Sequence, residues 1–219
     1  MNYLFPFLFL LFACVNGKKT ASKNAFRYLA LGDSYTIGES VDKEANYPSQ
    51  LGEKLEEQLK KKVEVQIIAR TGWTTDELQE AINAEKPSGK YDLVTLLIGV
   101  NNQYRGRDTT DYRPEFKALL DQAIHFAGNK KDHVIVVSIP DYGCTPFGKS
   151  RQASISEGID AYNNVARNIS KSEGVQFVDI TGISRNGLKQ PALVASDGLH
   201  PSAEQYKLWV EKILSEHQF

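Results

Sequence analysis

The chain has 219 residues, of which 41% are hydrophobic and 24% are charged, a balance that suits one α/β domain with a substantial core. The formal net charge of −1 and the lack of a basic block argue against nucleic acid as a partner. We find no internal repeat, low-complexity tract or long linker, so a second folded domain is not expected.

The N-terminal segment is apolar from residue 3 to residue 15. As a helix it would extend about 20 Å, against roughly 30 Å of bilayer hydrocarbon, so it is too short to span a membrane. We interpret residues 1–13 as a signal peptide, although no Lys or Arg stands near Met1. Residues 11–14, Leu-Phe-Ala-Cys, resemble the lipobox of bacterial lipoproteins, which implies a lipidated Cys14 and a short polar tether over residues 14–25.

Cys14 has two other possible fates. It is discarded if cleavage falls after it, and in an exported protein it can instead pair with Cys144, the second of the two cysteines. The sequence therefore predicts export, with the protein held at a bacterial envelope by a lipid anchor or otherwise periplasmic or secreted.

From residue 26 onward, apolar runs of strand length alternate with segments of helical periodicity. Tyr47-Pro48 is a typical helix start, and Thr74-Thr-Asp-Glu77 has the spacing of a capping box. Strands are predicted over 27–31, 63–69, 93–98, 134–139 and 175–180. Helices are predicted from 47 to 59, after 74, with apolar positions at 116–127 and a stop at Gly128, over 155–173 and from Pro201 onward.

Repeated strand–helix units with short connections predict a parallel sheet with helices on both faces, a three-layer α/β/α sandwich. We expect a flavodoxin-like, five-stranded sheet of order 2-1-3-4-5. Ligands bind beyond the carboxyl ends of the strands in such sheets. Ser34, Gly72, Asn101 and Asp141 each follow a successive predicted strand, so these residues should share one rim.

Residues 29–39 begin with an apolar run that ends abruptly in Gly-Asp-Ser at 32–34, which predicts a buried strand delivering Ser34 to the sheet edge. A serine hydroxyl is a poor nucleophile until a base accepts its proton. His200 is the best candidate for the base, and Asp197, three residues earlier, is placed to hold and orient its imidazole. The surroundings of His125, His133 and His217 suggest no comparable role.

Hydrolysis also needs donors for the oxyanion that forms. The backbone N–H groups of Ser34 and Gly72 and the side-chain amide of Asn101 are the candidates. Gly72 lacks a Cβ, so we expect its backbone to approach a substrate closely. Asp33 is expected to cap the turn around Ser34 rather than to take part in the chemistry.

Together, Gly32-Asp-Ser34, Arg70-Thr-Gly72, Gly99-Val-Asn101 and Asp197-Gly-Leu-His200 resemble, in order and placement, the sequence blocks of the SGNH, or GDSL, hydrolase family. The resemblance implies one SGNH-hydrolase-like domain over residues 26–219, with the matching serine, aspartate and histidine as its catalytic set and the matching glycine and asparagine as oxyanion donors. Asn102 departs from the family pattern, which commonly has aspartate there, and we expect the change to affect support of Asn101 more than reaction type.

The predicted reaction is acyl transfer from a carboxylic ester to water through an acyl-Ser34 intermediate, with no metal or organic cofactor. The chain looks closest to the lysophospholipase and acyl-esterase branch of the family, although acetyl esterases of carbohydrates share the same blocks. The side chains expected to line the pocket are Tyr35, Trp73, Tyr104, Arg105 and the 141–148 loop.

Two interpretations from other classes remain. One is a lipid-anchored binding protein that keeps the fold without turnover. The other is a flavodoxin-like phosphate binder in which Ser34, Thr36 and Gly38 cradle an anion.

Overall fold

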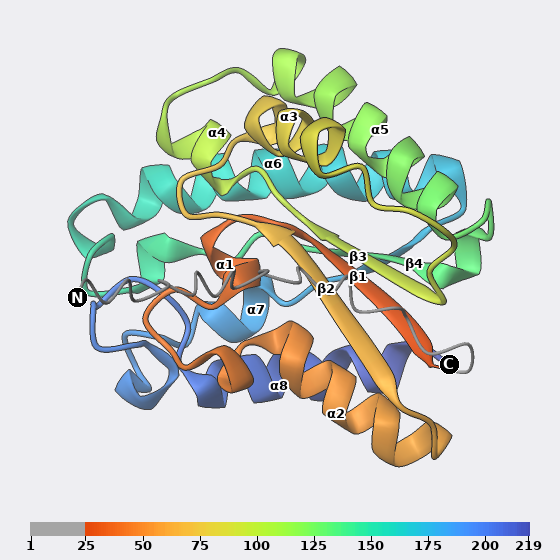
Figure 1. The fold of residues 1–219 in the computed structure, drawn as a ribbon. Helices are drawn as coiled ribbons and strands as arrows, with labels where there is room; N and C mark the ends of the chain where they lie inside the picture. Colours follow the sequence, from red (N-terminus) through yellow and green to blue (C-terminus); the bar gives the residue numbers. More distant parts are fainter. Residues whose placement is uncertain (1–24) are drawn as a thin grey trace, which may run out of the picture.

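The computed structural model describes residues 25–219, which form a five-stranded parallel sheet between two layers of helices (Figure 1). The sheet order is β2-β1-β3-β4-β5, so the predicted three-layer sandwich and strand order are confirmed. The strands are β1 (Phe26–Gly32), β2 (Val63–Ala69), β3 (Leu93–Leu97), β4 (Val134–Val137) and β5 (Gln176–Val178).

Helices cover both faces of the sheet, as right-handed crossovers between parallel strands require. Figure 1 shows α3, α5 and α6 on one face and α2 and α8 on the other. The long helices are α2 (Tyr47–Leu59), α3 (Thr75–Glu85), α5 (Thr109–Phe126), α6 (Gln152–Glu173) and α8 (Ala203–Glu216). Short helices follow three strands: α1 (Ser34–Ile37), α4 (Val100–Tyr104) and α7 (Thr181–Ser184). The connections also contain short 3₁₀ turns at Lys43–Ala45, Lys131–His133, Tyr142–Cys144, Lys149–Arg151 and Pro191–Leu193.

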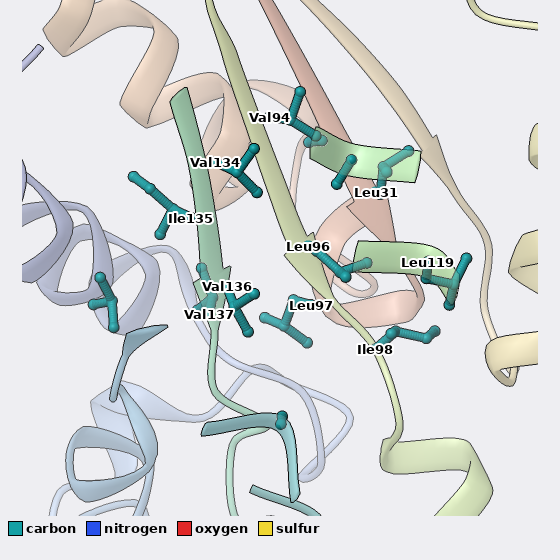
Figure 2. Packing of buried hydrophobic residues seen from close by; sticks show 14 of the residues in the cluster. Leu31, Val94, Leu96, Leu97, Ile98, Leu119, Val134, Ile135, Val136 and Val137 are labelled. Carbon is teal, nitrogen blue, oxygen red and sulfur yellow. The ribbon is translucent and has the colours of Figure 1, made fainter. Parts of the chain in front are cut away.

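The core is centred on β3 and β4, whose residues are all buried. Figure 2 shows side chains of both strands packed with Leu31 of β1 and Leu119 of α5. Each such side chain contributes roughly 1.5–3 kcal/mol through removal of apolar surface from water. The one polar side chain of β3, Thr95, is satisfied because its Oγ1 bonds the hydroxyls of Tyr28 and Tyr47, at 2.9 and 3.2 Å.

The fourth and fifth strands are shorter than predicted. Just beyond their ends, side chains make the hydrogen bonds that a neighbouring strand would otherwise make to the backbone. The backbone N–H of Ile139 donates to Asn163 Oδ1 at 2.8 Å, and the Ile139 carbonyl accepts from Asn163 Nδ2 at 2.9 Å. The N–H of Ile180 donates to Ser138 Oγ at 2.8 Å. The backbone groups of Ile139 and Ile180 are thus satisfied by side chains instead of by strand pairing.

One predicted helix start is wrong. The last helix begins at Ala203, with Ser202 as its N-cap, because Pro201 is held in an isolated bridge with Val194. The third long helix begins at Thr109, ahead of its predicted apolar positions, because Asp108 caps it by accepting from the N–H of Thr110 at 2.7 Å. The capping box predicted at Thr74 and Glu77 is confirmed.

The predicted signal peptide, Cys14 and all of the tether except residue 25 lie outside the described residues. Within residues 25–219, no helix combines the length and the apolar composition that crossing a bilayer requires.

Candidate active site

Ser34 is the first residue of α1, directly after the turn that ends β1. This turn needs Gly32, because a Cβ there would lie 2.0 Å from Thr36 Oγ1 and 2.5 Å from the carbonyl oxygen of Leu97. Because Gly32 packs closely against Thr36 and Leu97, only Asp33 lies between the end of β1 and the start of α1. Ser34 is 5% exposed at the carboxyl edge of the sheet.

Asp33 caps this turn, as predicted. Its Oδ1 accepts the N–H of Tyr35 at 3.0 Å, and its side chain is fully buried. Burial raises the pKa of this carboxyl from 3.8 to about 7, although backbone N–H groups oppose the shift. Asp33 is therefore part of the scaffold beneath Ser34.

Asp197 and His200 form a hydrogen-bonded pair at 2.6 Å, between Oδ2 and Nδ1. The three-residue spacing works because the segment bends back on itself: Asp197 Oδ1 accepts the N–H groups of Leu199 and His200, at 2.9 and 3.0 Å. Oδ2 also accepts Ser40 Oγ at 2.7 Å. Burial opposes ionisation of Asp197, but the bonds from His200, Ser40 and the two backbone N–H groups outweigh it and hold the pKa well below its usual range.

Ser34 and His200 line the same cavity of about 320 Å³, although 165 residues of chain separate them. With the Asp197 bond on Nδ1, the Nε2 side of the imidazole is left for the cavity. The His200 ring also packs edge-on against Tyr35, with ring centroids 5.6 Å apart. The remaining lining residues are Thr71, Gly72, Val100, Asn101, Tyr104, Tyr142, Phe147 and Leu199.

Gly72 lines this cavity in a left-handed conformation, with φ of +85°. A Cβ at this position would meet only Arg105 Nη2, at 3.9 Å. Within the protein, the backbone conformation rather than lack of space therefore favours glycine here. The close approach of this backbone to a substrate stays a prediction. The Gly72 carbonyl accepts Arg105 Nη2 at 2.6 Å.

Asn101 lies on α4, at the end of β3, and lines the same cavity. Its Nδ2 donates to the carbonyl of Trp73 at 2.9 Å. A primary amide carries two N–H donors, so this bond leaves a second donor on Nδ2. The cavity is therefore bordered by Ser34, Gly72 and Asn101, the three residues expected to supply oxyanion donors.

Asn102 supports this region from below. It is buried, accepts the N–H of Thr75 on Oδ1 at 3.1 Å and donates from Nδ2 to Thr75 Oγ1 at 2.6 Å. Thr75 Oγ1 in turn donates to Glu115. The residue that departs from the family pattern thus ties α4 to the start of α3, next to Asn101.

The cavity wall contains four of the expected aromatic side chains, Tyr35, Tyr104, Tyr142 and Phe147. The rings of Tyr104, Tyr142 and Phe147 form a triangle with centroid separations of 6.1 to 6.4 Å. Tyr104 and Phe147 are 55% and 46% exposed, so the triangle continues to the surface.

Some expected wall residues lie elsewhere. Trp73 and Arg105 are not among the residues that line the cavity; each instead takes part in holding the 71–77 segment against α4. Asp141 is fully buried, and its carboxylate accepts Ser156 Oγ, Arg185 Nε and the N–H of Gly143. It fixes the loop that carries Tyr142 and Phe147. Thr71, Val100 and Leu199 also line the cavity and were missed, because within the quoted blocks only their neighbours were assigned a role. Ser40, which bonds Asp197, was missed because no block contains it.

The phosphate-binder interpretation is wrong. Thr36 is fully buried against Gly32, and its Oγ1 has no hydrogen-bond partner among the described residues, so it cannot face an anion at the strand ends.

Cys144 is also buried, and its sulfur accepts Gln152 Nε2 at 3.3 Å. Its possible pairing with Cys14 stays a prediction, because Cys14 lies outside the described residues. In residues 25–219, no three His, Cys, Asp or Glu side chains are grouped to hold a metal ion.

Comparison with known proteins agrees with this geometry. The model of the GDSL-like lipase/acylhydrolase family matches residues 30–208, from β1 into α8, which makes the protein a carboxylic ester hydrolase. The chain belongs to the GDSL-like lipase/acylhydrolase family.

Individual relatives are distant. The chain is 22% identical over 205 residues to the spore germination lipase LipC of Bacillus licheniformis, covering 85% of this chain and 94% of LipC. The fold is similar to that of the lipase Lip_vut3 from a goat rumen metagenome, with a TM-score of 0.71, 18% identity and coverage of 87% and 97% of the two chains. It is also similar to a mutant of Axe2, an acetyl-xylooligosaccharide esterase from Geobacillus, with a TM-score of 0.67, 22% identity and coverage of 90% and 95%.

Proposed function

We propose that this hydrolase works through an acyl-Ser34 intermediate, with His200 as general base and acid and Asp197 as the group that orients His200. The observation that carries the proposal is the Asp197–His200 pair, bonded at 2.6 Å, on the same cavity as Ser34. A hydroxyl, an imidazole and a carboxylate in this relation are the parts of an activated serine nucleophile.

In the first half-reaction, Ser34 Oγ forms a bond to the ester carbonyl carbon while its proton passes to His200 Nε2. The resulting oxyanion accepts hydrogen bonds from the N–H groups of Ser34 and Gly72 and from Asn101 Nδ2. The bond to the alcohol oxygen then breaks, and the imidazolium returns the proton to that oxygen. Asp197 holds Nδ1–H throughout and stabilises the transient imidazolium.

In the second half-reaction, water takes the place of the serine. His200 accepts a proton from the water, whose oxygen attacks the acyl carbon. Collapse of the second tetrahedral intermediate releases the carboxylic acid and returns the proton to Ser34 Oγ. No redox partner or metal ion is needed for the atoms and charges to balance.

For the substrate we propose an acyl ester longer than acetate, such as a lysophospholipid. A cavity of about 320 Å³ bordered by aromatic rings offers more apolar surface than an acetyl group covers. The similarity to LipC, a lipase, agrees with this choice. The similarity to Axe2 keeps acetyl esters of carbohydrates as the alternative, since sugar rings also stack on aromatic side chains.

The test is hydrolysis of p-nitrophenyl esters from acetate to dodecanoate by the domain over residues 25–219. We expect kcat/KM to rise from acetate toward medium chains. Ser34→Ala or His200→Ala should lose on the order of 10⁴ to 10⁶ in kcat. Full turnover by Ser34→Ala would point to another nucleophile; no turnover of any ester by the wild type would favour the non-catalytic binding protein.

We further propose that the enzyme is exported and held at a bacterial envelope by a lipid on Cys14. The support is the apolar run over residues 3–15 and the lipobox-like residues 11–14. Mass spectrometry of the mature N-terminus should find an acylated Cys14 as the first residue. A free, unmodified N-terminus beginning after Cys14 would remove the anchor and leave a periplasmic or secreted protein.

A further inference from the structure

Ser40 adopts a backbone conformation that its sequence does not require. Its φ is +68°, and among residues 25–219 only Lys60, Lys86 and Asn129 also combine a positive φ with a side chain beyond glycine. Lys60 and Lys86 are the residues directly after α2 and α3, where a left-handed residue is ordinary. Asn129 is of a residue type that adopts this conformation readily. Ser40 lies in an exposed loop two residues after the left-handed Gly38 that already caps α1, so its conformation needs another cause.

The side-chain contact of Ser40 supplies that cause. Ser40 Oγ donates to Asp197 Oδ2 at 2.7 Å, across 157 residues of sequence. The same oxygen accepts His200 Nδ1 at 2.6 Å. The other hydrogen bonds that Asp197 accepts come from Leu199 and His200, within its own turn. Within the described chain, Ser40 is therefore the donor that ties this carboxylate to a different segment.

That segment is the one that carries Ser34. Ser40 follows Ser34 by six residues, and the intervening backbone is fixed to α1 by the N–H groups of Gly38 and Glu39, which both donate to the Ser34 carbonyl, at 3.1 and 3.0 Å. Glu39, the residue before Ser40, accepts the hydroxyl of Thr71, which lies on the Gly72 side of the cavity. The loop at 38–41 thus connects the Ser34 turn to both the Asp197 turn and the Gly72 loop.

We infer that Ser40 is a positioning residue for the reaction: its hydroxyl fixes the Asp197 carboxylate relative to Ser34, and Asp197 in turn aims the His200 imidazole at the Ser34 hydroxyl. The inference rests on the proposed roles of Ser34, Asp197 and His200. A serine is retained in a left-handed conformation because glycine, which adopts that conformation freely, has no hydroxyl to donate.

Ser40→Gly separates this role from a purely structural one. Glycine relieves the backbone and removes the hydrogen bond, so the thermal midpoint should stay level or rise by up to about 4 °C. In contrast, kcat should fall about 10- to 100-fold, with KM changed by less than about twofold, because an oriented bond to a charged group is lost. A structural residue would instead lose activity and stability together, or neither.

Lys60→Gly is the matched control. Lys60 has a similar left-handed φ of +51°, is exposed, and lies just before β2 begins, at the end of the sheet opposite the cavity. The same substitution there should stabilise the fold and leave kcat at the wild-type value. An equal loss of kcat in both variants would show that glycine acts through general flexibility and would overturn the inference.

A double-mutant cycle completes the test. If Ser40 acts through Asp197, then Ser40→Gly should cost less than about twofold in kcat when Asp197→Ala is already present. The same fold loss in both backgrounds would overturn the role of Ser40, as would wild-type kcat in Ser40→Gly while activity still depends on Asp197. Wild-type kcat in Asp197→Ala alone would remove the proposed mechanism as well, so the two failures are distinguishable.

Discussion

Two turns near the cavity begin in the same way and end in opposite electrostatic states. Asp33 directly follows β1, whereas Asp197 lies in the loop before α8. Each uses Oδ1 to accept the N–H two residues ahead, at 3.0 and 2.9 Å. Their other oxygens differ. Asp33 Oδ2 is buried with no hydrogen-bond partner in the described part of the chain, whereas Asp197 Oδ2 accepts both His200 and Ser40.

The consequence is a pair of carboxyls whose pKa values are pushed apart. Burial raises the pKa of Asp33 to about 7, while for Asp197 the four hydrogen bonds overcome burial and lower the pKa. Titratable groups with opposed environments mark different tasks. Asp197 remains a charged partner for His200, and Asp33 is a turn cap that can hold a proton near neutral pH.

The largest expected difference between the two turns is in turnover. Asp197→Asn should lose about 10⁴ in kcat, because a neutral amide no longer fixes the tautomer of His200 or stabilises its charge. Asp33→Asn keeps an acceptor for the N–H of Tyr35 and should lose less than about tenfold. Steady-state kinetics on one p-nitrophenyl ester measures both. Equal losses in the two variants would contradict the separation of roles.

The next largest expected loss of kcat comes from Asn101, a proposed oxyanion donor that contacts neither aspartate. Asn101→Ala should lose roughly 10² to 10³ in kcat with KM little changed, since the amide acts on charge that develops in the transition state. The fold should survive, as judged by thermal unfolding. Asn102→Ala serves as comparison, because it breaks the contacts to Thr75 and should lower stability as well as activity. A loss in KM alone for Asn101→Ala would argue for substrate binding instead.

The pH dependence of stability separates the two turns by sign. The pKa of Asp33 is raised above its ordinary 3.8, so its contribution is fully present below about pH 4 and is lost as pH rises through about 7. Asp33→Asn should therefore gain roughly 3 to 4 kcal/mol over the wild type between about pH 4 and about pH 8. Asp197 has a lowered pKa, so its contribution is present above the ordinary value and is lost as pH falls toward acid. Urea unfolding of the wild type and of both Asn variants measures the two slopes, above about pH 4 for Asp33 and below it for Asp197, and slopes of the same sign would disprove the contrast.

The smallest expected effect concerns the aromatic triangle of Tyr104, Tyr142 and Phe147. Phe147→Ala should lower kcat/KM about tenfold for long-chain esters and less than about twofold for acetate, because only a longer acyl group covers the exposed ring. Leu188→Ala, which removes an exposed apolar side chain that does not line the cavity, is the matched control. If the acetate ester suffers as much as the long-chain esters, the triangle does not select acyl length.

Much of this arrangement was predictable because its signals are local. Apolar runs and helical periodicity predicted the strands and helices, and a flavodoxin-like arrangement of them predicted the strand order. The rule that ligands bind at the carboxyl ends of parallel strands brought Ser34, Gly72 and Asn101 to one rim. Predicted element ends were wrong where distant residues make contacts. Asn163 bonds Ile139 and so ends the pairing of β4, and the Val194–Pro201 bridge places the start of α8 later than predicted. Asp141 follows a strand as predicted, yet packs inward to hold its own loop.

By itself, the sequence determined the α/β sandwich, the family and the residues able to carry ester hydrolysis, because hydrophobic periodicity and short-range turn chemistry are written within a few neighbouring positions. Only the tertiary structure decided which aspartate has a lowered pKa and which a raised one, that Ser40 reaches Asp197, and which aromatic rings border the cavity. Those properties depend on burial and on partners supplied from more than a hundred residues away, and no local pattern records them.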